Sequence, residues 1–191
     1  MKSIDDTFFD EAEDGYMPVI PGLYPAHVTS LESRSFDSGS MVFNITFQIA
    51  DEAKDMQISK QSKNGSGQWN TDKDEKGDDV KISAGYLSGK KFRSTGVWLT
   101  PSPGKGQGWK NRNYVHFFEP LGVNFPEADG KTKIMEVEES DVLGIPSLVK
   151  IGEEEYEKDG ETKTAVRIFS TFPWKDGKKL DPSEIEEEVP F

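Results

Sequence analysis

The chain has 191 residues, with 35 acidic and 23 basic side chains, a formal net charge of −12 and no cysteine. Hydrophobic residues make up 34% of it, which suits one domain with appendages rather than several domains. The lack of cysteine excludes a disulfide framework, a thiolate nucleophile and a cysteine-ligated zinc site. No apolar run approaches the ~18 residues of a membrane helix. Residues 1–14 are acidic, unlike a signal peptide, so we expect a cytoplasmic protein with no membrane partner.

Charge is unevenly distributed along the chain. Residues 1–53 carry 10 acidic and 2 basic side chains, whereas residues 54–112 carry 6 acidic and 12 basic ones. Residues 113–175 carry 13 acidic and 7 basic side chains, and residues 176–191 carry 6 and 2. The overall charge argues against a nucleic-acid binder, whose surface is usually basic. The basic middle indicates either contact with a polyanion or simply lysine-rich exposed loops.

The first predicted elements are strands. Residues 1–18 are acidic and predict an N-terminal arm outside the domain. Residues 22–31 predict a strand and residues 36–40 a turn. In Met41–Ile49 apolar and polar residues alternate, which indicates a strand with one buried face. Residues 51–79 are polar and predict a long mobile loop.

Strand-like, loop and helical segments follow this loop. Residues 80–86 and 90–99 favour strands, and residues 100–108, rich in Gly and Pro, favour a flexible loop. Residues 111–123 predict a helix that Asn111 or Asn113 could cap and that Gly122 would end.

The remaining pattern predicts a hairpin and, with it, the fold class. Residues 148–169 read as two strands around an Asp159-Gly160 turn. The order strand, strand, long loop, strand, helix, hairpin is that of an oligonucleotide/oligosaccharide-binding (OB) barrel, and other small β-barrels satisfy it too. We predict a mainly β, OB-fold-like five-stranded barrel with one helix and long loops over residues 19–174. An acidic C-terminal tail is predicted over residues 175–191.

The sequence carries little that indicates catalysis. His27 and His116 are far apart, and neither has a companion at ligand spacing. Residues 104–108 are glycine-rich but lack the spacing of a phosphate-binding loop. We therefore predict no catalytic residue, no metal site and no cofactor. An enzyme with an unrecognised site is the third-ranked hypothesis, and it would require a cation or consume a substrate.

The basic middle also contains aromatic residues, a mixture that favours binding of single-stranded nucleic acid. Cations follow the phosphates while aromatic faces stack on the bases. In a regular strand Lys91 and Arg93 share one face. Phe92 and Trp98 then share the other, so all four line one groove only if a bulge intervenes near Gly96.

Two aromatic residues differ in how they fit this prediction. Phe92 suits the core and the ligand surface equally well, whereas Trp109 lies in a polar context that favours a ligand. The predicted DNA-binding residues are Lys81, Tyr86, Lys90, Lys91, Phe92, Arg93, Trp98, Lys105, Trp109, Lys110 and Arg112.

The last eight residues read Glu-Ile-Glu-Glu-Glu-Val-Pro-Phe. A solvated acidic end explains the glutamates but not the final Val-Pro-Phe. A phenylalanine ring beside a carboxylate can dock in an apolar pocket with a cationic rim, toward which the acids add long-range attraction. The predicted partner-binding residues are Glu186, Glu187, Glu188, Val189, Pro190 and Phe191.

This ending resembles the acidic tip of bacterial single-stranded DNA-binding proteins, whose consensus ends Asp-Asp-Asp-Ile-Pro-Phe. The upstream domain is similar in outline to phage-encoded single-strand binders, in which a β-barrel with large loops precedes an acidic tail. The resemblance implies a non-catalytic protein that coats single-stranded DNA during replication, recombination and repair. It implies that the tip recruits host or phage replication and recombination proteins, in the host cytoplasm if a phage encodes the chain. A homo-oligomer is compatible with it.

The leading hypothesis is therefore sequence-tolerant binding and protection of single-stranded DNA. The alternative is a tail-bearing interaction protein that captures a host replication factor without binding DNA.

Overall fold

Two long antiparallel strands open the fold in the computed structural model, which describes residues 17–101 and 109–185 but not the side chain of Lys110. Strand β1 (Gly22–Ser35) pairs with β2 (Met41–Ile49) across the predicted turn. The alternation expected for β2 is confirmed, since Phe43, Ile45 and Phe47 are fully buried while the residues between them are half-buried.

The segment expected to be a loop after β2 contains short elements instead. Asn64 Oδ1 accepts hydrogen bonds from the Ser66 and Gln68 backbone amides. Asp74 Oδ1 does the same for two backbone amides in the next turn. These polar side chains fix tight turns without apolar burial, which explains why hydrophobic patterning missed the strands. The elements of this segment are η2 (Asp51–Asp55), β3 (Gln57–Ser59), β4 (Gln61–Lys63) and β5 (Trp69–Thr71), with β4 paired to β5. Strand β3 pairs with β6 (Lys81–Ser83), which lies where the sequence predicts a strand over residues 80–86.

The third barrel strand is broken into two pieces. After η3 (Ala84–Leu87), strands β7 (Lys91–Arg93) and β8 (Val97–Leu99) both pair with β2. Arg93 lies opposite Thr46, and Val97 lies opposite Phe43. The interval is three residues on β2 and four on the β7–β8 segment, so this segment contains one extra residue. The extra residue forms a β-bulge. The alternation of inward-facing and outward-facing side chains therefore shifts by one residue between β7 and β8.

One ten-residue helix, α1 (Trp109–Phe118), follows, and η4 (Glu119–Leu121) extends it. Gly122 ends the helical segment in the left-handed conformation at φ 84°, as expected. Asn111 does not cap the helix. It is buried inside the first turn, where its amide exchanges two 2.8 Å hydrogen bonds with the Thr100 backbone. Short elements then lead back to the barrel: β9 (Glu127–Ala128), β10 (Lys131–Thr132) and α2 (Glu139–Val142).

A long hairpin completes the barrel. Strands β11 (Pro146–Lys158) and β12 (Glu161–Pro173) turn at Asp159 and Gly160, both at positive φ, as the sequence predicts. The sheet order is β12-β11-β1-β2-β7, with β8 continuing the β7 edge. A parallel bridge between Ser94 and Ile168 brings the two edges together, and the Thr95 amide donates to the Ile168 carbonyl at 2.9 Å. The protein is thus mainly β, with a nearly closed, OB-fold-like five-stranded barrel.

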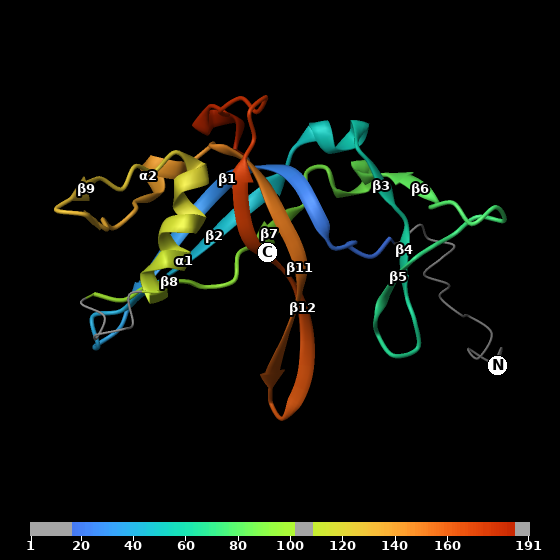
Figure 1. Ribbon diagram of the computed structural model, residues 1–191, viewed down its shortest axis with the longest axis horizontal. Helices are drawn as coiled ribbons and strands as arrows, with labels where there is room; N and C mark the ends of the chain where they lie inside the picture. The colour runs from blue at the N-terminus through green and yellow to red at the C-terminus, as the bar shows by residue number, and fades with distance from the viewer. Residues whose placement is uncertain (1–16, 102–108, 186–191) are drawn as a thin grey trace, which may run out of the picture.

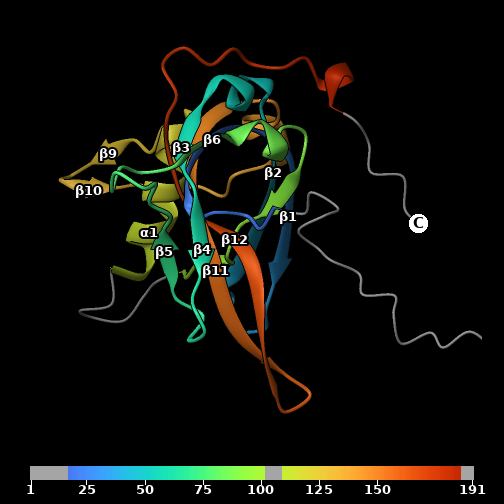
Figure 2. The same cartoon turned by 90° about the vertical axis from the view of Figure 1, so that its right-hand side faces the viewer.

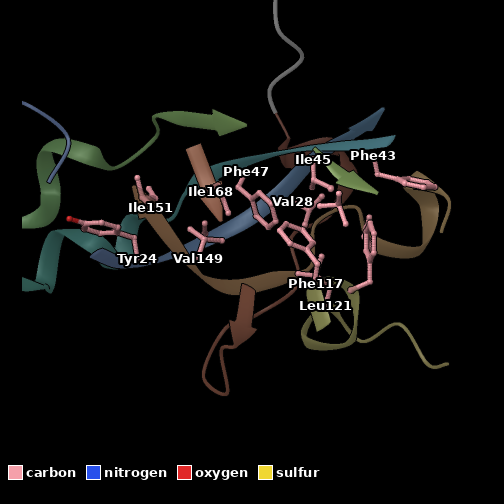
Figure 3. Close-up of a cluster of buried hydrophobic side chains, with 14 of the residues drawn as sticks. Tyr24, Val28, Phe43, Ile45, Phe47, Phe117, Leu121, Val149, Ile151 and Ile168 are labelled. Atoms are coloured by element: carbon pink, nitrogen blue, oxygen red, sulfur yellow. The ribbon is translucent and has the colours of Figure 1, made fainter. Parts of the chain in front are cut away.

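The core fills the barrel and extends beneath α1. Figure 3 shows side chains from β1, β2, β11, β12 and the helical segment pointing toward one another, including Val28, Phe47, Phe117 and Ile168. Burying one such side chain contributes about 1.5–3 kcal/mol. This packing fixes α1 against β8 and β12, at one side of the barrel (Figure 1).

Two hairpins project from the barrel. The β11–β12 hairpin extends well past the pairing of β11 with β1, which ends at Ile151, and the β4–β5 hairpin lies to its side (Figure 1). Among residues 17–101 and 109–185, no helix is long and apolar enough to cross a membrane.

The chain after Trp174 begins as part of the folded body. His27 Nε2 lies 2.9 Å from the Lys178 carbonyl, and the Leu180 amide donates to the Gly144 carbonyl at 3.0 Å. A Cβ at Gly144 would lie 2.4 Å from the Leu180 carbonyl oxygen, so glycine permits this contact. The segment passes over one end of the barrel (Figure 2) and reaches η5 (Pro182–Glu184). Residues 177–180, expected to belong to the acidic tail, therefore contact the barrel instead.

Candidate functional site

The outer face formed by β1, β2, β7 and β8 carries a row of exposed side chains. Arg34 lies opposite Val42 on β2, and Val42 lies opposite Trp98 on β8. Directly opposed residues of antiparallel strands share a face. The Trp98 side chain therefore projects outward, and it is 48% exposed although its neighbour Val97 is buried. In OB folds the outer face of the second and third strands is where oligonucleotides bind.

Trp98 is held in a ladder of stacked groups. The Phe36 ring stacks on it with centroids 5.3 Å apart and an interplanar angle of 24°. The Arg34 guanidinium lies 5.1 Å from the Phe36 ring centroid, a cation–π contact. Gly96 makes room for the arrangement, because a Cβ there would lie 2.8 Å from Val42 Cγ2 and 3.5 Å from Trp98 Nε1. We call Arg34, Phe36 and Trp98 the aromatic ladder; it fixes an exposed indole before any ligand binds.

Cationic side chains lie on the same face. Lys91 is opposite Gln48 and Arg93 is opposite Thr46, on the outward side of β2. The bulge between β7 and β8, stated above as the condition for a shared groove, brings both onto the face that carries Trp98. Arg93 Nη2 pairs with Glu32 Oε2 at 2.6 Å, and the two side chains are 47% and 70% exposed. Such an exposed ion pair contributes little free energy, so a phosphate could replace the carboxylate.

Beside Trp98 a cleft of about 790 Å³ opens between β8, α1 and β12. Its walls carry Trp98, Trp109, Phe169 and Phe172, which are 48%, 59%, 39% and 41% exposed. Among the described residues, Tyr156 is the one other aromatic side chain exposed to this degree. The exposed aromatic surface is therefore concentrated around one cleft.

The polar lining of the cleft comes from α1 and β12. Asn113 and His116 are exposed on α1, and Ser170 lies on β12. Thr171 Oγ1 donates to the Phe117 carbonyl at 2.5 Å, which ties α1 to β12. The Asn111–Thr100 hydrogen bonds tie the first turn of α1 to the end of β8. Both walls are thus held by contacts in which the exposed side chains of the lining take no part.

Some sequence-predicted residues come together at this site. Lys91, Arg93 and Trp98 share the outer face. Trp109 lines the cleft, and Arg112 is exposed on the same helix.

Other predicted residues lie away from the outer face. Lys81 is on β6, where its Nζ donates to Ser59 Oγ at 2.7 Å. Tyr86 is half-buried against the core, and its hydroxyl donates to the Pro18 carbonyl at 3.1 Å. The Lys90 ammonium lies 5.6 Å from the Tyr86 ring centroid. Phe92 faces inward opposite Phe47 and packs against the core, so we leave it and Tyr86 out of the proposed surface.

Lys105 and the tip residues Glu186, Glu187, Glu188, Val189, Pro190 and Phe191 lie outside the described residues, as does the Lys110 side chain. The first sixteen residues of the predicted N-terminal arm lie outside them too.

Sequence reasoning missed Arg34, Phe36, Phe169 and Phe172. Two signals were present. Phe36 is an aromatic residue in a turn, and Ile168 and Phe169 are adjacent apolar residues in a strand, so one of them must face outward. Their gathering around one cleft depends on barrel closure, which no local pattern reveals.

The β11–β12 hairpin differs from this face in charge. Glu153 pairs with Lys63 at 2.6 Å and accepts a 3.2 Å hydrogen bond from Trp69 Nε1. Trp69 is thereby held by the hairpin, and Lys63 lies 5.2 Å from its ring centroid. The outer hairpin carries the acids Glu154, Glu155, Glu157, Asp159 and Glu161. A polyanion following the outer face would be repelled from this hairpin.

Shifted pKa values occur away from the cleft. Burial raises the pKa of Tyr114 to about 12, and burial also raises the pKa of Tyr24 and of Tyr86. Hydrogen bonds from Lys73 and Ser59 lower the pKa of Asp79. These groups stabilise the fold and its loops rather than line the cleft.

In the described part of the chain, no three His, Asp or Glu side chains are grouped as they would be around a metal ion. No protein-family model matches the chain, and a search of curated proteins finds no match to it.

Proposed function

We propose that the protein binds single-stranded DNA without sequence specificity and without catalysis, through the outer face of β1, β2, β7 and β8. The observation that carries this proposal is the aromatic ladder, which presents the exposed Trp98 indole beside Lys91 and Arg93 on an OB-fold-like barrel. Stacking of a base on an aromatic side chain is worth about 1–3 kcal/mol and tolerates any sequence.

Stacking favours a single strand over a duplex. The faces of duplex bases are already stacked on one another, so an exposed indole can stack only on an unpaired base. Duplex readers instead place a helix or ribbon in the major groove. Here α1 packs three of its aromatic side chains, Tyr114, Phe117 and Phe118, into the core.

Phosphates would be bound by the cations on the same face. Arg93 can exchange the Glu32 carboxylate for a phosphate oxygen, and the bidentate geometry of a guanidinium suits either partner. Because bound phosphates release counterions, the affinity should fall as salt rises.

We further propose that Glu186, Glu187, Glu188, Val189, Pro190 and Phe191 recruit replication, recombination and repair proteins. The support is the resemblance of these residues to the acidic tip of bacterial single-stranded DNA-binding proteins. A protein lacking residues 189–191 is expected to bind DNA with equal or slightly higher affinity and to lose partner binding. Loss of DNA affinity on this deletion would contradict the docking role.

The DNA-binding proposal is tested by fluorescence anisotropy with labelled oligo-dT, a duplex and single-stranded RNA at two salt concentrations. Oligo-dT should bind more tightly than the duplex, and its affinity should fall as the salt concentration rises. The variant K91A/R93A should bind more weakly and reduce the slope of log affinity against log salt by about 2, one for each phosphate contact. The matched control, K131A/K133A on the β9–β10 hairpin, removes the same charge outside this face and should change the affinity far less.

Two results would overturn this proposal. Equal effects of the two double variants would show that only net charge matters. The second result is a protein that binds none of the three nucleic acids but still captures a replication protein through residues 186–191. It would favour the alternative, an interaction protein that does not bind DNA.

A further inference from the structure

We propose that the cleft between β8, α1 and β12 takes one unstacked nucleobase from the bound strand, and that Asn113 and His116 read the edge of this base. This inference rests on the proposed function and deepens it. It adds a base-selective subsite to a surface that is otherwise indifferent to sequence.

The shape and composition of the cleft suit a flat ring. Its volume of about 790 Å³ lies within the range of about 300–1,000 Å³ that is usual for small-ligand sites. Four of its aromatic side chains remain at least 39% exposed: Trp98 on β8, Trp109 on α1, and Phe169 and Phe172 on β12. Aromatic side chains clustered at a surface mark a binding site more often than a solvated face. A nucleobase can stack on exposed aromatic rings of this kind.

One side of helix α1 presents three side chains to the cleft. Trp109, Asn113 and His116 are spaced four and three residues apart, so they lie along one side of the helix. All three are exposed and line the cleft, whereas Tyr114 and Phe118 on the opposite side are fully buried. The helix thus presents one ring and two polar groups to the same opening.

Asn113 and His116 have unused hydrogen-bonding capacity. An asparagine amide offers both a donor and an acceptor, and so does a neutral imidazole. Within the described residues neither side chain makes a hydrogen bond, whereas the neighbouring Asn111 and Thr171 are fully engaged in holding α1 in place. A nucleobase edge presents such paired donors and acceptors, and an aliphatic ligand does not.

Two further features of the cleft favour a nucleobase as its occupant: its lining is uncharged, and it adjoins the outer face. The described lining contains no Lys, Arg, Asp or Glu, so it suits an uncharged base rather than a phosphate. Trp98 belongs to both the aromatic ladder and the cleft. A strand that stacks one base on Trp98 therefore has its neighbouring base at the mouth of the cleft.

Ultraviolet crosslinking of the full chain to oligo-dT containing one 5-iodouracil, with mass spectrometry of the peptides, tests the location. The expected adducts are on Trp109, Phe169 or Phe172, besides Trp98. Adducts confined to Phe36 and Trp98 would overturn the subsite while leaving the proposed function intact. Adducts on Trp109 that increase only when residues 189–191 are deleted would show that the end of the chain occupies the cleft, and would also overturn it.

Affinities of the four DNA homopolymers test base reading. The wild-type protein should bind the four homopolymers with different affinities. N113A and H116A should each reduce the ratio of the highest to the lowest of these affinities by about fivefold or more. Y156A, which removes an exposed aromatic side chain outside the cleft, should leave the ratio unchanged. Because Asn113 and His116 are exposed, thermal unfolding of both variants should match wild type.

Equal wild-type affinity for all four homopolymers, or an unchanged ratio in both cleft variants, would overturn base reading without affecting single-strand binding. Titration with the four deoxynucleoside monophosphates, followed by tryptophan fluorescence, separates the two proposals further. Mononucleotide binding that N113A weakens, together with binding of long strands, supports the subsite. The same mononucleotide result without binding of long strands would retain a base-binding cleft but overturn the proposed function. Failure of both mononucleotides and long strands overturns both proposals.

Discussion

Aromatic side chains form two sets in this protein, one in the core and one around the cleft, and α1 contributes to both. The buried set centres on Tyr114, whose ring centroid is 5.2 Å from that of Phe43 and 4.8 Å from that of Phe118. The exposed set surrounds the cleft, with Trp98 and Trp109 as its largest members. The residue types are alike, but one set is fully buried and the other is about half exposed.

The difference shows that the direction in which each residue of an element points, rather than the composition of the element, separates the core from the exposed aromatic surface. On β8 Val97 points inward and Trp98 outward, and on β12 Ile168 points inward and Phe169 outward. Each element therefore has an apolar side chain on both faces. The inward one is explained by packing, whereas the outward one adds nothing to the core and is available to a ligand.

The largest expected effect comes from breaking the buried set. F43A should lower the free energy of unfolding by about 3–5 kcal/mol, because it leaves a cavity against Tyr114 and Phe118. Urea unfolding measures the loss. The fraction that remains folded should bind oligo-dT as wild type does. A loss below about 1 kcal/mol would contradict the assignment of Phe43 to the core.

Removing a side chain of the exposed set should weaken DNA binding while leaving the stability of the fold nearly unchanged. W98A should weaken oligo-dT binding by about 5- to 150-fold, the equivalent of losing 1–3 kcal/mol of stacking. Its urea midpoint should stay close to that of wild type. Y156A is the matched control, since Tyr156 is 39% exposed but lies on the hairpin outside the cleft. If Y156A weakens binding as much as W98A, the cleft region has no special role.

A hydroxyl group distinguishes Tyr114 from the other rings of the buried set. It donates to the Met135 carbonyl at 3.1 Å and accepts from the Val137 amide at 2.9 Å, and burial raises its pKa from 10.0 to about 12. Below pH 10.0 this tyrosine is neutral in both states and adds no pH dependence. Between pH 10.0 and about 12 only the unfolded chain ionises, so the free energy of unfolding falls.

The fall from Tyr114 should reach at most about 1.4 kcal/mol per pH unit. Y114F should lose about 1 kcal/mol at neutral pH through its missing hydrogen bonds. It should show a shallower decline above pH 10.0, leaving the part due to Tyr24 and Tyr86, whose pKa values burial also raises. Urea unfolding at pH 8, 10 and 11 measures both. Parallel declines in wild type and Y114F would contradict the raised pKa of Tyr114.

The smallest expected effect concerns the outer face. E32Q should tighten oligo-dT binding by at most about fivefold at low salt, because it frees Arg93 from an exposed ion pair. The gain should shrink as salt rises. E155Q on the acidic hairpin removes the same charge without freeing Arg93, and it serves as the control in the same anisotropy assay. An equal gain in E155Q would mean that only net charge was sensed.

Much of the fold was predictable because its signals are local. The alternation in β2, the Asp159-Gly160 turn and Gly122 at the end of the helical segment each depend on a few neighbouring residues. The strands within residues 51–79 were not predictable from apolar periodicity, because side chains such as Asn64 and Asp74 form their turns. Asn111 looked like a cap but ties α1 to β8, a contact that only tertiary structure supplies.

The candidate site was predictable in part. Lys91, Phe92, Arg93 and Trp98 were expected to share a groove only if a bulge lay near Gly96. The register of β7 and β8 against β2 contains such a bulge, which places Trp98 with Lys91 and Arg93, but Phe92 faces inward. Phe36, Phe169 and Phe172 come from turns and strands far apart in the sequence. Closure of the barrel between Ser94 and Ile168 brings them to one side, and this closure has no local signature.

The central claim is that the exposed aromatic side chains stack on bases of a single strand. The most direct measurement is a tryptophan-fluorescence titration of the full chain with poly-dT and with a matched duplex, at low and moderate salt. The account predicts strong quenching by poly-dT that weakens with salt, little quenching by the duplex, and loss of most of the quenching in W98A. Unchanged fluorescence with poly-dT, or equal quenching by the duplex, would contradict it.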